Sequence, residues 1–143
     1  MRDDRLAAAV LAEIAELHEF FAAWFLGNCP KSPAGFARVA DALAAGFVQI
    51  DPQGRERRRA PLLALLRAAH GGRAGEAFAI GIVGPKVRLV HRGLALATYE
   101  ERQRSGATVT RRRSSALFAA ALTAPEGVAW LHLQETWIAA PEG

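Results

Sequence analysis

Glu135 is the single carboxylate in the strand-like segment at 128–138 (VAWLHLQETWI). Strand side chains alternate between two faces, so Glu135 shares one face with the odd-numbered apolar residues, which we expect to be buried. These are Ala129, Leu131, Leu133 and Trp137. The even-numbered residues, expected on a mixed and less buried face, are Trp130, His132, Gln134 and Thr136. An acid on a buried face needs a partner, a proton or a ligand, so the segment predicts a lined pocket.

The residues alone leave two interpretations of Glu135 open. In the first it is a pocket acid, because desolvation disfavours its charged form and raises its pKa. In the second it forms a structural ion pair with Arg112 or Arg113 on the neighbouring strand. Tyr99 presents a similar choice, since its hydroxyl either faces a ligand or finds a backbone partner, as buried tyrosines usually do.

The first half of the chain must supply helices against which such a strand could pack. From Leu6 to Leu26 apolar residues recur at three- and four-residue spacing, which predicts a helix with one buried stripe. After a break rich in glycine and proline, the pattern predicts a second helix over 34–45, closed by Gly46. A short strand over 47–50 and a turn (DPQG) precede a third helix over 61–70.

The second half reads as four long strands joined by short turns. Such links predict antiparallel hairpins, because parallel neighbours need a crossover of about a dozen residues or more. Strands of this length predict a strongly curved sheet, with an irregularity at Gly84-Pro85. Helices followed by a sheet indicate the α+β class. The four segments are 78–91, 94–104, 108–122 and 128–138.

Composition limits the domain count and the compartment. A chain of 143 residues with 51% hydrophobic residues predicts one domain over 1–143. Its arginine and alanine bias is typical of a GC-rich bacterial genome. A single cysteine, Cys29, excludes an internal disulfide and favours a reducing cytoplasm. No signal-peptide pattern and no long apolar span are recognised, so we expect a cytoplasmic protein without a membrane segment.

Sequence motifs do not predict a metal or a cofactor, since the zincin, C-x-x-C, dinucleotide-binding and P-loop patterns are missing. Two arginine runs, 57–59 and 111–113, raise the question of nucleic acid. The second run alternates across a strand, so its members cannot form one patch. Aromatic residues do not interleave with either run, which argues against nucleic-acid binding.

The order of helix, helix, short strand, helix and long antiparallel meander resembles the nuclear transport factor 2-like superfamily, also described as a cystatin-like fold. The segments that carry the resemblance are LAEIAELHEFFAAWF, FVQIDPQG, LALATYEE, RRRSSALF and WLHLQETW. They are most similar to an uncharacterised bacterial branch related to SnoaL-like proteins and to the calcium/calmodulin-dependent kinase association domain. The resemblance implies a cone in which N-terminal helices pack in the concave face of the curved antiparallel sheet.

Within that cone we expect a ligand site built from apolar walls and a few polar groups. The similarity to the association domain implies that Arg112 and Ser114 point inward, whereas a one-residue slip would substitute Arg113 and Ser115. The expected ligand-binding residues are Trp24, Phe47, Tyr99, Glu101, Arg112, Ser114, Glu135 and Trp137.

Two hypotheses of function follow, and whether the chain is an enzyme stays open. The first is a protein that binds a small apolar or anionic molecule and forms a homodimer through the less buried face of its sheet, where Trp130, His132, Gln134 and Thr136 would meet a second copy. The second is a lyase or isomerase with Glu135 or Glu101 as general base and Tyr99 or Arg112 stabilising developing negative charge.

Overall fold

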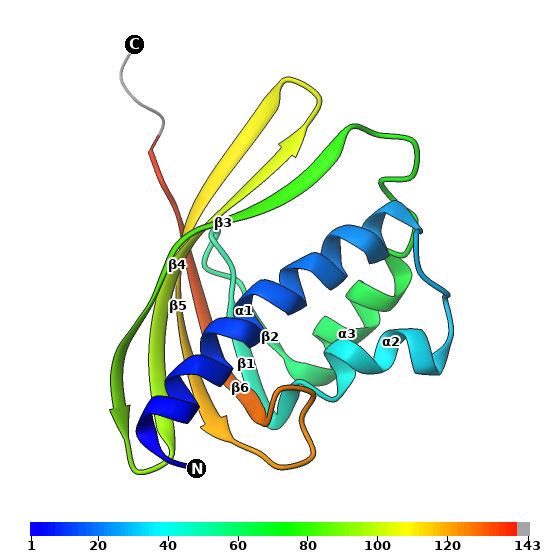
Figure 1. Cartoon of the computed structure of the whole chain (residues 1–143). Helices are drawn as coiled ribbons and strands as arrows, with labels where there is room; N and C mark the ends of the chain where they lie inside the picture. The colour runs from blue at the N-terminus through cyan, green and yellow to red at the C-terminus, as the bar shows by residue number, and fades with distance from the viewer. Residues whose placement is uncertain (140–143) are drawn as a thin grey trace.

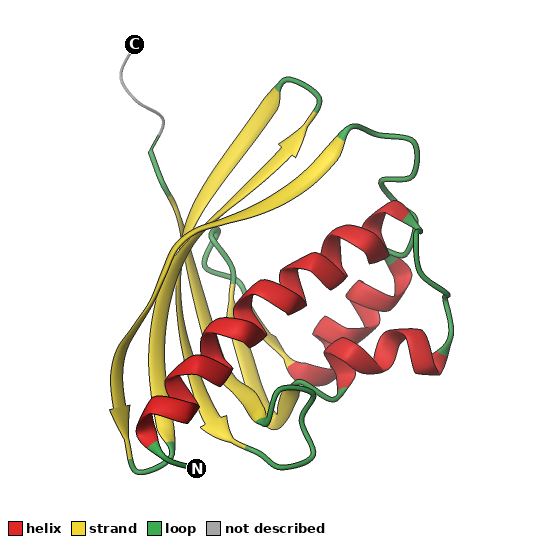
Figure 2. Ribbon diagram, viewed as in Figure 1, coloured by secondary structure: helices red, strands yellow, loops and turns green. Residues whose placement is uncertain are grey.

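The computed structural model describes residues 1–139 as three helices and a six-stranded sheet (Figure 1). The helices are α1 (Asp3–Leu26), α2 (Pro33–Ala40) and α3 (Arg59–Ala68). The strands are β1 (Leu43–Ile50), β2 (Glu56–Arg58), β3 (Phe78–His91), β4 (Leu94–Ser105), β5 (Thr108–Ala120) and β6 (Val128–Trp137). They are ordered β2-β1-β6-β5-β4-β3 in the sheet, which curls around the helices (Figure 2). The predicted α+β class with helices on the concave face is confirmed.

The first helix crosses the sheet because one stripe of its side chains is apolar. Leu6, Val10, Ile14 and Leu17 follow one another at three- or four-residue spacing and are at most 3% exposed. The helix ends at Gly27, whose φ of 76° lies in the left-handed region that favours glycine. The predicted first helix is therefore confirmed. It begins at Asp3, so Asp3 and Asp4 lie in its first turn.

The second helix is shorter than predicted, since the helix expected over 34–45 contains only eight residues. The residues that follow it join the sheet instead. Trp130 donates its backbone N–H to the Ala42 carbonyl over 2.9 Å, and Leu43 is the register partner of Trp130. Gly46 consequently lies inside β1, not at a helix end. This β1–β6 pair is parallel, whereas the other pairs of the sheet are antiparallel.

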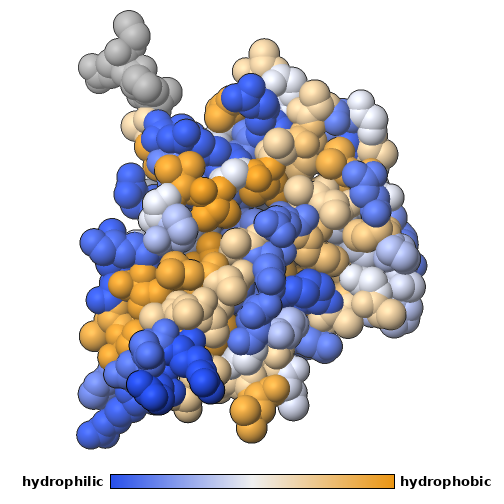
Figure 3. Space-filling model, in the orientation of Figure 1, coloured by the Kyte–Doolittle hydropathy of each residue, from blue (hydrophilic) through white to orange (hydrophobic). Residues whose placement is uncertain are grey.

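The four long strands agree with the predicted segments to within two residues, and their three hairpin pairings are antiparallel. The register of β3 against β4 shifts between Val83 and Lys86, which confirms the irregularity expected at Gly84-Pro85. Because β3 is an edge strand, part of it reaches solvent. Figure 3 shows hydrophobic residues along this edge, where Val83 and Leu89 are exposed.

A β-bulge in β6 corrects the predicted facing of the last strand. The register shifts between Trp130 and His132, so Leu131 has no register partner on β5. The extra residue inverts the alternation, and Trp130 points into the core at 1% exposure while Glu135 stays buried at 5%. The prediction that Trp130 lies on the less buried face is therefore wrong. Trp137, expected to be buried, is 40% exposed.

A buried carboxylate that the sequence did not predict ties α1 to α2 and β6. Arg38 donates to both oxygens of Glu13, over 2.7 Å to Oε1 and 3.2 Å to Oε2. The indole N–H of Trp130 donates to Oε2 over 2.8 Å. Burial raises the pKa of Glu13, although both donors act in the opposite direction. The inverted facing of Trp130 is what makes this contact available.

Candidate functional site

A cavity of about 160 Å³ lies between α1, α3 and the concave face of the sheet. Most of its lining side chains are apolar, as is usual for small-molecule sites. Among the apolar lining residues are Leu17, Phe21, Phe47, Leu62, Leu66 and Leu133. The helices supply mainly this apolar wall. The strands supply the polar wall, which gathers side chains from β1, β4, β5 and β6.

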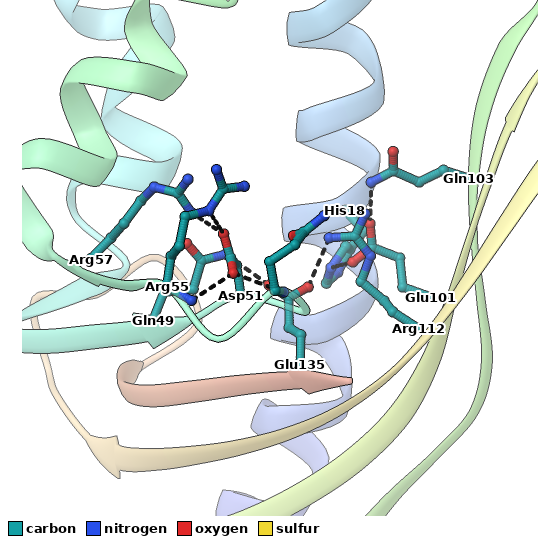
Figure 4. A network of polar contacts seen from close by, with 10 residues as sticks. His18, Gln49, Asp51, Arg55, Arg57, Glu101, Gln103, Arg112 and Glu135 are labelled. Carbon is teal, nitrogen blue, oxygen red and sulfur yellow. Dashed lines mark hydrogen bonds and ion pairs between the residues drawn. The ribbon is translucent and has the colours of Figure 1, made fainter. Parts of the chain in front are cut away.

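The polar wall carries a buried pair formed by His18 of α1 and Glu101 of β4 (Figure 4). His18 Nε2 lies 3.1 Å from Glu101 Oε1, and its Nδ1 lies 2.7 Å from the backbone carbonyl of Ile14. A carbonyl oxygen and a carboxylate oxygen both accept, so both ring nitrogens carry a proton and His18 is an imidazolium beside a carboxylate. Gln103 donates to the second carboxylate oxygen of Glu101 over 2.6 Å.

Opposing effects set the pKa values of this pair. Burial lowers the pKa of His18, but the hydrogen bond and charge of Glu101 outweigh it, and the net direction is upward. Burial raises the pKa of Glu101, but the hydrogen bond and charge of His18 bring it down to about 2. Each partner thus keeps the other charged in a place where neither would be charged alone.

Glu135 of β6 faces the same cavity and forms a second buried pair, with Arg112 of β5. Arg112 Nη1 donates to Oε2 over 3.1 Å, and Gln49 Nε2 donates to Oε1 over 2.7 Å (Figure 4). Burial raises the pKa of Glu135, Arg112 acts against this, and the charge of Glu101 adds to it. The two interpretations of Glu135 therefore hold together, since it is paired with arginine and still has a raised pKa.

Four buried side-chain atoms have no hydrogen-bond partner within residues 1–139, and all belong to this region. They are Gln49 Oε1, Tyr99 Oη, Arg112 Nε and Ser114 Oγ. Gln49, Tyr99 and Arg112 line the cavity, and Ser114 is the register partner of Tyr99 across β4 and β5. Burial raises the pKa of Tyr99 well above its usual value, the charges of Glu101 and Glu135 add to this, and the nearby Ser114 hydroxyl and the charge of Arg112 oppose it. Leaving a polar atom buried without a partner costs about 1–3 kcal/mol, so these four atoms concentrate an unmet energetic cost in this part of the fold.

The structure brings most of the predicted site residues together. Phe47, Tyr99, Glu101, Arg112 and Glu135 line the cavity, and Ser114 adjoins it through Tyr99. Of the two registers left open for β5, the structure has the one in which Arg112 and Ser114 point inward. Arg113 and Ser115 lie exposed on the opposite face of the strand.

Two predicted tryptophans lie away from the cavity lining. Trp24 packs in the core between the helices, where its indole N–H donates to the Leu66 carbonyl over 2.7 Å. Trp137 lies near the end of β6, beyond the reach of the helices, with the Arg112 guanidinium 4.8 Å from its ring centre. The sequence identified both as aromatic residues suited to a pocket wall, but it did not show whether they would reach the cavity.

Sequence reasoning did not include His18, Gln49 or Gln103 among the site residues. A signal existed for two of them. His18 follows Ile14 by four residues on the buried stripe of α1, and Gln49 shares the alternation of Phe47 in β1. Polar residues at positions on the apolar face of a helix or strand are therefore the sequence pattern that indicates this site.

Within residues 1–139, no group of histidine, cysteine, aspartate and glutamate side chains is arranged to hold a metal ion. No helix in the same part of the chain has both the length and the apolar character needed to cross a membrane.

Comparison with known proteins gives structural matches alone. No protein-family model matches the chain, and no curated protein is a significant match. A solved NTF-2-like protein of unknown function from Pseudomonas aeruginosa is similar with a TM-score of 0.80 and 24% identity, over 92% of this chain and 99% of that one.

Two further solved structures are similar at lower identity. The CaMKII hub of S. rosetta has a TM-score of 0.70 and 14% identity, over 92% of this chain and 96% of that one. An uncharacterised protein with a cystatin-like fold from Caulobacter vibrioides has a TM-score of 0.67 and 14% identity, over 92% and 89%. At these identities the similarity establishes the shared architecture alone.

Proposed function

We propose that this chain, which has the nuclear transport factor 2-like fold, is a small-molecule-binding protein whose ligand occupies the cavity between α1, α3 and the sheet. The observation that carries the proposal is the set of four unpartnered buried polar atoms around one apolar cavity. A ligand with an apolar body and a polar group would give some of these atoms a partner while it fills the apolar volume.

The cavity volume limits the size of the ligand body. A volume of about 160 Å³ is close to that of an engineered apolar cavity, roughly 150 Å³, that binds benzene. The ligand body is therefore about the size of one aromatic ring. Arg112 Nε offers a donor, and the hydroxyls of Tyr99 and Ser114 each offer a donor as well. A hydroxyl, carbonyl or carboxylate oxygen on the ring would accept from them.

Native mass spectrometry of freshly purified protein, followed by denaturing extraction, tests this directly. The expected result is a released molecule with a ring-sized apolar body. A parallel thermal-shift assay uses benzoate and benzyl alcohol as probes with two matched variants. Ser114→Ala removes an inward hydroxyl, whereas Ser115→Ala removes an exposed one on the opposite face of β5. We expect Ser114→Ala to change the probe-induced shift and Ser115→Ala to leave it unchanged. An empty protein that binds neither probe would contradict the proposal.

The raised pKa of Glu135 favours a second candidate function, an enzyme of the lyase or isomerase type. Glu101 is a poor general base because His18 holds its pKa at about 2. In this alternative Glu135 takes a proton from carbon next to a carbonyl group, and Tyr99 or Arg112 stabilises the oxyanion that develops.

Deuterium incorporation next to the carbonyl of cyclohexanone, followed by mass spectrometry, tests this second function. Exchange above the buffer rate that is lost in Glu135→Gln supports an enzyme. Exchange that is equal in the two proteins rules out Glu135 as the base for this probe.

We also propose that the chain forms a homodimer through the outer face of its sheet. Its structural neighbours include hub domains from two organisms. Trp130 is excluded from such an interface because it is buried in the core, which leaves Gln134 and Thr136 exposed on the outer face of β6. Size-exclusion chromatography with light scattering should give a dimer that Gln134→Arg converts to a monomer. A monomeric wild-type protein would contradict this proposal.

A further inference from the structure

A groove adjoins the cavity over the paired ends of β3, β4 and β5. It has a volume of about 270 Å³ and shares Gln103 and Arg112 with the cavity lining. Figure 4 shows these two side chains beside Glu101. Because both residues line both spaces, the cavity and the groove adjoin at these two side chains.

The charge of this groove is positive. Arg73, Arg104 and Arg112 line it, and none of its lining residues is acidic. Two of these arginines lie against aromatic rings, with Arg73 5.2 Å from the ring centre of Phe78 and Arg112 4.8 Å from that of Trp137. Stacking on a ring restricts a guanidinium without using its N–H donors.

The carboxylates nearest to these arginines cancel only part of the charge. Arg73 pairs with Glu76 over 3.5 Å, but both side chains are more than two fifths exposed, so solvent screens the pair. Arg112 pairs with Glu135 through Nη1, and its buried Nε has no partner within residues 1–139. Arg104 has no carboxylate within ion-pair distance in the same range.

We propose that the groove is an anion subsite, so that the ligand is a ring-sized apolar body with a short flexible arm that ends in a carboxylate or a phosphate. The inference rests on the proposed function, since the body must first occupy the cavity. The arm leaves the cavity between Gln103 and Arg112, and its anionic end lies near Arg73. Arginine suits this role because its fork of donors matches both carboxylate and phosphate oxygens.

Isothermal titration calorimetry with three matched probes tests the subsite. Phenylbutanol has the body and arm without charge, phenylbutyrate adds a carboxylate, and phenylbutyl phosphate adds a phosphate. We expect both anions to bind more tightly than the alcohol, and the tighter of the two identifies the anion class. Arg73→Gln should weaken the anions by about fivefold, the most that an exposed ion pair usually contributes, and leave phenylbutanol unchanged. Arg113→Gln, on the opposite face of β5, is the control and should change none of the three.

The outcomes separate the subsite from the proposed function. Binding of phenylbutanol with no preference for the anions, or a preference that Arg73→Gln does not reduce, overturns the subsite and leaves the cavity proposal standing. Failure of all three probes overturns both. Arg73 is exposed, and its described side-chain contacts are the screened ion pair with Glu76 and the Phe78 ring, so its substitution should lower the melting temperature only slightly. Binding measured well below that temperature isolates the effect on the ligand.

Discussion

Replacing Glu135 by glutamine is the change that best tests how the site is built. Burial is the largest influence on the pKa of Glu135 and raises it, so the ionised carboxylate is held at a cost to folding in spite of Arg112. Glutamine resembles the protonated acid. An acid whose pKa is raised in the folded state stabilises the fold most below its ordinary value of 4.5 and loses that contribution as pH rises through the folded pKa.

The hydrogen bonds of Glu135 survive the substitution. The new side-chain oxygen can accept from Arg112, and its NH₂ group can donate to Gln49 once the Gln49 amide rotates. That rotation breaks no bond, because Gln49 Oε1 has no partner in the described chain. The variant then loses only the difference in stability between a charge-assisted and a neutral hydrogen bond. Removal of the buried charge offsets this loss. We expect Glu135→Gln to change the free energy of unfolding at pH 7 by no more than about 1 kcal/mol.

Urea denaturation of the wild type, Glu135→Gln and Glu135→Ala measures this. Alanine leaves the buried Arg112 without its partner, so we expect a loss of about 3–5 kcal/mol. As pH falls through the folded pKa, the wild type should gain stability relative to Glu135→Gln. A loss of more than about 2 kcal/mol in Glu135→Gln at pH 7 would refute the reasoning, because the ion pair with Arg112 would then outweigh burial.

Two further predictions concern the other buried acids. The raised pKa of His18 stabilises the fold below its ordinary value of 6.5 and the lowered pKa of Glu101 above its ordinary value of 4.5, so the pair contributes most between these limits. The free energy of unfolding measured against pH should fall on both sides of this window, and His18→Gln should remove the fall on the alkaline side; an unchanged alkaline limb would contradict the pairing. Glu13→Ala leaves Arg38 and the Trp130 indole without their shared acceptor and should cost about 3–5 kcal/mol in urea denaturation. Glu16→Ala, on the exposed side of the same helix, should cost less than about 1 kcal/mol, and equal losses in the two variants would show that the burial of Glu13 is unimportant.

Alternation along the last strand placed Glu135 on a buried face, where the structure also has it. Alternation could not predict a change of phase, and the bulge at Leu131 therefore reversed the expected facing of Trp130. Local patterns carry no information on which strand a residue will pair with.

The same limitation explains the error in the second helix. The alanine-rich residues from 41 to 45 suit a helix, yet the backbone of Leu43 pairs with β6, far along the chain. Tertiary pairing overrides local propensity there. His18 was left out of the predicted site for a different reason, because its burial follows the helical stripe but its partner lies on β4. A buried histidine can be recognised from sequence, whereas the acid that charges it cannot.

The bulge in β6 sets which face of the strand each later side chain occupies, and no substitution could have this effect. On either side of Leu131 the strand keeps its own phase, so Trp130 closes the core and Glu135 faces the cavity from the same strand. Loss of one residue at this point would turn every later side chain over, exchanging Glu135 with its solvent-facing neighbours in a single step. Related chains can therefore acquire or lose this acid through length change alone, and alignments of such chains need a gap at this position to match equivalent residues.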